Sequence, residues 1–116
     1  SYTHPEYLEM LSEYFLTASD PARGDAFLMR GTEGETVANA NKAQQIDWFH
    51  GVERTVLVEK QLLVEELPHL PAERDAATTA AWIAAVLRGE VPVPPSIAEQ
   101  VAQCLTASRQ IAARPR

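Results

Sequence analysis

The sequence is short of the residues that would mark a secreted, a membrane-spanning or a nucleic-acid-binding chain. Its 116 residues include one cysteine, Cys104, so no internal disulfide can form and a reduced cytoplasm is the expected location. No apolar run approaches the ~18 residues of a membrane span, and the first residues lack the basic-then-apolar pattern of a signal peptide. Lys and Arg number 10 against 16 Asp and Glu, and this net charge of −6 argues against a nucleic-acid partner.

Alternating runs of β-branched and aromatic residues, which are typical of strands, are also scarce. The chain is instead rich in Ala, Leu, Glu and Gln, which favour helices. Hydrophobic residues make up 46% and charged residues 22%, a composition that predicts a single folded core rather than disorder. We therefore expect an all-α protein of four or five helices.

Helical spacing and capping patterns place these helices. Thr3-His4-Pro5-Glu6 has the spacing of a capping box and begins a predicted helix over 4–17. Further helices are expected over 21–30, over 37–60 as the longest, as a short turn over 62–67, and over 72–88 with Gly89 as a left-handed cap. The prolines of 91–95 predict an extended connector. The expected organisation is a helical domain over 1–90, the connector over 91–95, and a C-terminal helix or arm over 96–116.

No set of residues predicts catalysis or metal binding by this chain alone. Asp47, His50 and Glu53 lie three apart on the predicted long helix, but a metal site in a helix bundle needs a second such set on a facing helix. We interpret them as a solvated helix face. Cys104 lies on the apolar stripe of the last predicted helix, where a cysteine is usually a small buried hydrophobe. We expect no catalytic residue, no metal ligand and no cofactor in this chain.

The large aromatic residues leave two roles open. Trp48, Phe49 and Trp82 could pack in the core, or they could anchor an interface, where Trp is enriched. The proline-rich connector favours the second role, because a helix beyond it has little of its own domain to pack against.

The segment 46–67 resembles the helical N-terminal part of the β subunit of nitrile hydratase and its stand-alone counterpart in thiocyanate hydrolase. The matching residues are Trp48, Gly51, Glu53, Arg54, Leu57, Val58, Glu59, Lys60, Glu66 and Leu67. The proline-bearing exit over 89–95 also looks like the tail that follows the helices of that family. Gln44-Gln45 replaces an aromatic pair of the family, and Asn41 lies near the place of an arginine that holds oxidised cysteines of the metal-bearing subunit.

The resemblance implies a lyase subunit that is not catalytic alone. The chain would be a small helical β-type subunit that supports a metal-bearing α-type subunit, with cobalt or iron in that partner and a nitrile-type substrate to hydrate. A further small β-barrel subunit could complete the hetero-oligomer, and a metal-loading activator is a variant of this hypothesis. The implied partner-binding residues are Trp48, Phe49, Arg54 and Trp82. The alternative is a non-enzymatic all-α interaction or accessory protein.

Overall fold

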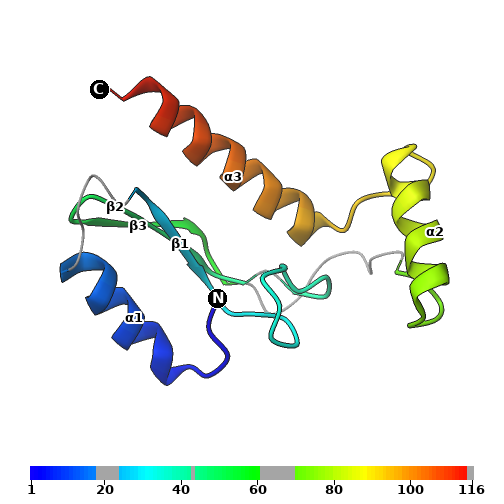
Figure 1. Cartoon of the computed structure of the whole chain (residues 1–116), viewed down its shortest axis with the longest axis horizontal. Coiled ribbons are helices and arrows are strands. Elements are labelled where there is room, and N and C mark those ends of the chain that lie inside the picture. The colour runs from blue at the N-terminus through cyan, green and yellow to red at the C-terminus, as the bar shows by residue number, and fades with distance from the viewer. Residues whose placement is uncertain (18–23, 43, 61–69, 115–116) are drawn as a thin grey trace.

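The computed structural model describes residues 1–17, 24–42, 44–60 and 70–114, and this part of the chain is mixed α and β. The described elements are α1 (Glu6–Thr17), β1 (Ala26–Met29), β2 (Ile46–His50), β3 (Glu53–Val58), α2 (Ala76–Leu87) and α3 (Pro95–Ala113). The prediction of an all-α fold is therefore wrong. Figure 1 shows the three strands at the centre, with α1 and α3 on opposite sides of them and α2 set apart.

The predicted long helix over 37–60 is replaced by a β-hairpin. Trp48, Phe49, Val52 and Val56 do have helical spacing, but they belong to β-branched and aromatic segments that also suit a strand. Gly51 has a φ of +62°, a left-handed conformation that glycine adopts without strain, and it turns the chain between β2 and β3. Val52 lies in this turn and is 77% exposed. The predicted short helix over 21–30 is also wrong for its described residues, because Ala26–Met29 forms β1. The predicted helical turn over 62–67 lies outside the described residues.

The sheet is antiparallel, with the order β1-β2-β3 and β2 at its centre. Side chains alternate along β2, so its two faces meet different helices. Phe49 faces α1, where its ring centroid lies 5.3 Å from that of Phe15. Ile46 faces α3 and packs with Ile97 of that helix. Beta-strand β2 is therefore covered on both faces, and four of its five residues are buried.

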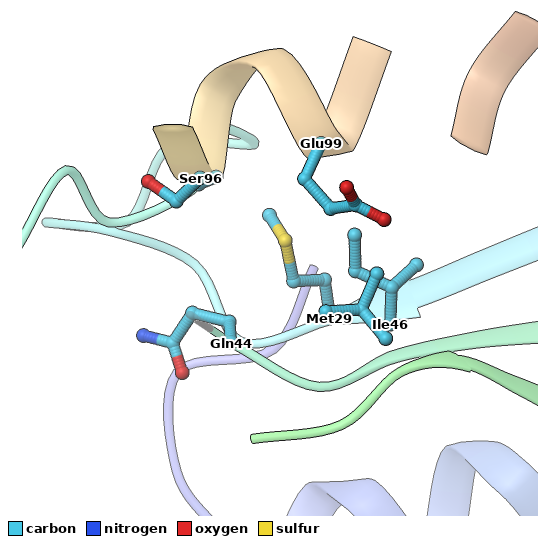
Figure 2. A pocket seen from close by; sticks show the side chains of 7 residues that line it. Met29, Gln44, Ile46, Ser96 and Glu99 are labelled. Carbon is cyan, nitrogen blue, oxygen red and sulfur yellow. The ribbon is translucent and has the colours of Figure 1, made fainter. Parts of the chain in front are cut away.

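The first turns of α3 are held by apolar packing on the sheet and by two hydrogen bonds to residues 38–39, in the segment between β1 and β2. Met29 and Ile46 lie beneath this end of the helix, close to Ser96 and Glu99 (Figure 2). The Ser96 hydroxyl donates to the Asn39 carbonyl at 2.6 Å, and a bond of 2.8 Å joins the Ala38 amide to the Gln100 side chain. The space left among these side chains is about 10 Å³, roughly that of one water. This region is a packed core rather than a ligand site.

Helix α2 lies outside this core. Its N-terminus is capped by Asp75, whose Oδ1 accepts from the Thr78 amide at 2.8 Å. Gly89 follows it with a φ of +77°, which confirms the predicted left-handed position after the helix. No residue of α2 is buried.

The described elements form an extended shape. The radius of gyration is 16.1 Å, whereas about 13 Å is typical of a compact domain of this length. The accessible surface is 8292 Å², against roughly 6,300 Å² for a compact monomer of this mass. The chain therefore presents about 2,000 Å² more surface than a compact monomer. No described helix combines the length and the apolar character that crossing a membrane requires.

Candidate functional site: buried polar anchors and an exposed apolar helix

Asp47 on β2 is the centre of a buried polar cluster. Its side chain is 1% exposed, and both of its oxygens accept from the Gln45 amide at 3.1 and 3.0 Å. Arg54 is the cross-strand partner of Phe49, so it projects from the same face as Asp47 and donates to both oxygens at 3.2 Å. The guanidinium also lies 5.7 Å from the centroid of the Phe49 ring. These bonds engage the carboxylate fully, so Asp47 stabilises the hairpin and is not placed to act as an acid or base.

Asp25 and Arg114 tie the end of α3 to the start of β1. Arg114 donates to both Asp25 oxygens at 2.6 and 2.8 Å, and the indole nitrogen of Trp48 donates to Asp25 at 2.7 Å. Hydrogen bonding from Arg114 lowers the pKa of Asp25, and the bond from Trp48 acts in the same direction. The Arg114 guanidinium lies 6.0 Å from the centroid of the Trp48 ring. Three separate elements meet at this carboxylate.

His50, at the end of β2, lies beside a hydroxyl and a carboxylate, as a base that activates a nucleophile does. The carboxylate is too far away for a hydrogen bond, and the group does not line a described cavity. Its Nε2 lies 2.8 Å from the Thr55 hydroxyl, and its Nδ1 lies 3.7 Å from a Glu53 oxygen. A distance of 3.7 Å is too long for a hydrogen bond, and the Glu53 side chain is 73% exposed. None of the three residues lines the described cavities. We assign this group no catalytic role.

The predicted site residues lie on two separate elements. Trp48 and Phe49 are 4% and 3% exposed on opposite faces of β2, Arg54 is paired with Asp47, and Trp82 is partly buried on α2. Their role as partner contacts stays a prediction. Asp47, His50 and Glu53 do not share a helix face, because they belong to the hairpin, and Cys104 is exposed rather than buried. Within the described ranges, no three His, Cys, Asp or Glu side chains are grouped to hold a metal ion.

The helices also carry an apolar surface that is not among the predicted site residues. Helix α2 has no charged residue, and its Ile83 and Leu87 are 46% and 82% exposed. Large exposed hydrophobic side chains also lie on α1 and α3: Tyr7, Met10 and Tyr14, and Val101, Leu105 and Ile111. The signal was present in the sequence, because the run from 76 to 87 is too uniformly apolar for a helix with a solvated face.

Two hollows border the described core. A groove of about 280 Å³ lies between Asp25 and the second half of α3, and it is lined mainly by small or apolar residues. A larger hollow of about 660 Å³ lies between the loop after β1 and the approach to α2. Arg30, Lys42 and Arg74 line it together with Glu33 and Glu73, so cations and anions are interspersed. The residues that line these two hollows do not form a recognisable catalytic or metal-binding group.

The geometry defines a small α+β module: an antiparallel sheet between two helices, with an apolar helix outside the core. None of the known protein-family models matches the chain. One curated relative, described as "Uncharacterized protein YbiB" of Escherichia coli (strain K12), is 42% identical over 113 residues. The match covers 97% of this chain and 33% of the relative, so the chain spans about a third of the length of the curated relative it matches.

Proposed function

We propose that this chain is a non-catalytic protein-interaction module that docks through α2. One observation carries the proposal: the twelve residues of α2 include no charged side chain, and none of the twelve is buried. Leu87, at the end of the helix, is 82% exposed.

A helix that is apolar on all sides is normally found inside a protein rather than at its surface. Covering a Leu or Ile side chain that is otherwise in water contributes about 1.5–3 kcal/mol. Ile83 and Leu87 lie four residues apart, so they project from the same side of α2 and can enter one partner surface together. Helix α2 thus has the composition of an interface element.

The polar clusters of the sheet support a structural role. Asp47 and Asp25 are each held by an arginine and by a further donor, and no described buried side-chain polar atom lacks a hydrogen-bond partner. Such fully bonded clusters position secondary structure and have no free group for catalysis.

The nitrile hydratase-type subunit stays a prediction of the sequence resemblance. The helix on which that prediction placed its partner contacts is a hairpin, and Trp48 and Phe49 are buried within this chain. Neither comparison names a nitrile hydratase. No described contact favours that function over the interaction module.

Paired substitutions test the docking role of α2. Ile83→Asp with Leu87→Asp places two charges on the exposed face of α2, and Val52→Asp places one on the exposed hairpin turn as a matched control. We expect the unmodified chain and the Val52→Asp control to bind a hydrophobic dye equally, and the α2 variant to bind clearly less of it. Equal dye binding by all three proteins would contradict the proposal.

A further inference from the structure

We infer that the apolar helix faces of this module are covered by additional polypeptide of the same protein, in a longer chain built like the relative. This inference rests on the proposed docking role of α2 and names what occupies that surface. The surface concerned comprises the exposed hydrophobic side chains of α1, α2 and α3.

The amount of exposed surface favours a large and permanent occupant. The total surface of the chain, polar and apolar together, exceeds that of a compact monomer by about 2,000 Å², whereas a standard protein complex covers roughly 800 Å² of each partner. An area of 2,000 Å² on one side is typical of obligate interfaces, which resemble the core of a domain. The exposed hydrophobic side chains lie on three helices, so a partner of ordinary size that covers one helix would leave those of the others in water.

The distribution of the surface argues against a second copy as the occupant. Tyr7, Met10 and Tyr14 follow one side of α1, while Ile83 and Leu87 lie on α2. Figure 1 shows these two helices at opposite ends of the molecule. A twofold dimer covers both regions only if α1 of each copy packs against α2 of the other, and a dimer through one region alone leaves the second exposed.

The relative supplies polypeptide of the required size. It contains a region that matches 97% of this chain, and two thirds of its length lie outside that region. The same hydrophobic surfaces in such a protein would lie beside a much larger body of chain. The acidic residues Glu6, Glu9 and Glu13 flank the apolar side of α1, so the covering surface is expected to have a basic rim there.

Hydrogen exchange on two proteins tests this assignment: the 116-residue chain and the full-length relative from Escherichia coli. We expect the amides of α2 to exchange quickly in the chain, and those of the matching helix to exchange about 100-fold more slowly in the relative. The strand β2 should be protected in both proteins, which controls for folding. Within the relative, the turn that matches 51–52 gives the rate of an exposed segment.

Fast exchange of the matching helix in the relative, at the rate of that exposed turn, would overturn the inference. Protection of α2 in the 116-residue chain through a stable dimer, abolished by Leu87→Asp, would also overturn it, because the occupant would then be a second copy. That second outcome leaves the docking role of α2 intact. An α2 that binds neither dye nor protein in any form removes both the inference and the proposed function.

Discussion

The strand β2 and the helix α2 are both rich in apolar residues, but they differ in how deeply these residues are buried. Four of the five residues of β2 are buried between α1 and α3, and its one buried charge is paired with an arginine. None of the twelve residues of α2 is buried, and none carries a charge. The comparison shows that apolar composition alone does not define the core of this chain. The core is where side chains from several elements converge, and α2 lacks such neighbours among the described elements.

The largest expected effect is at the buried carboxylate of the sheet. Asp47→Ala leaves the Arg54 guanidinium and the Gln45 amide without their acceptor, and we expect the free energy of unfolding to fall by about 3–5 kcal/mol. Urea denaturation measures this loss. Glu53→Ala is the matched control, since its exposed carboxylate should contribute less than about 1 kcal/mol. Equal losses in both variants would show that the Asp47 cluster does not hold the hairpin.

A smaller and pH-dependent effect is expected at the contact between β1 and α3. Asp25→Asn weakens the charge-assisted bonds from Arg114, and we expect a loss of about 1–3 kcal/mol at neutral pH. Because the folded chain lowers the pKa of Asp25, its stabilisation is present above the unfolded value of about 3.9 and is lost as the pH falls through the folded value. The difference between the two proteins should therefore close below about pH 4. A difference that persists unchanged into acid would contradict this assignment.

The hairpin turn should respond to a single added methyl group. Gly51→Ala introduces a Cβ at a φ of +62°, and we expect a loss of about 1–2 kcal/mol through backbone strain. No atom lies within 4 Å of the added Cβ, so a steric clash would not explain the loss. Thermal unfolding measures the effect, and an unchanged melting temperature would show that this turn has a different conformation in solution.

The smallest effect is expected at the most exposed leucine. Leu87→Ala should change the free energy of unfolding by no more than about 0.5 kcal/mol, because the side chain is 82% exposed. Phe49→Ala, which removes a buried ring of β2, should cost about 3–5 kcal/mol by contrast. A large loss for Leu87→Ala would show that α2 packs against this chain in solution.

Local patterns predicted some of the helices. The capping box at Thr3–Glu6 correctly indicated a helix at the N-terminus, Gly89 correctly marked the end of α2, and α3 begins beside the predicted position 96. These features depend on neighbouring residues, whose effects can be evaluated from spacing alone.

The strands and the candidate site depend on pairing between distant residues. The segment from Trp48 to Val56 satisfies helical spacing and strand composition at once, and only its pairing with β1 and the turn at Gly51 decide between them. Asp47 meets Arg54 only through the register of the hairpin, and Asp25 meets Arg114 across 89 residues. The apolar composition of α2 could be seen in the sequence, but its exposure could not.

The central claim is that α2 lies outside the described core, with Ile83 and Leu87 exposed to solvent. Small-angle X-ray scattering tests this claim most directly. It is measured on the monomer fraction of the unmodified chain and on the double variant Ile83→Asp with Leu87→Asp, whose added charges suppress association. We expect a radius of gyration near 16.1 Å for both proteins. A value near the roughly 13 Å of a compact domain would mean that α2 folds back onto the sheet, and the docking role of α2 would be contradicted.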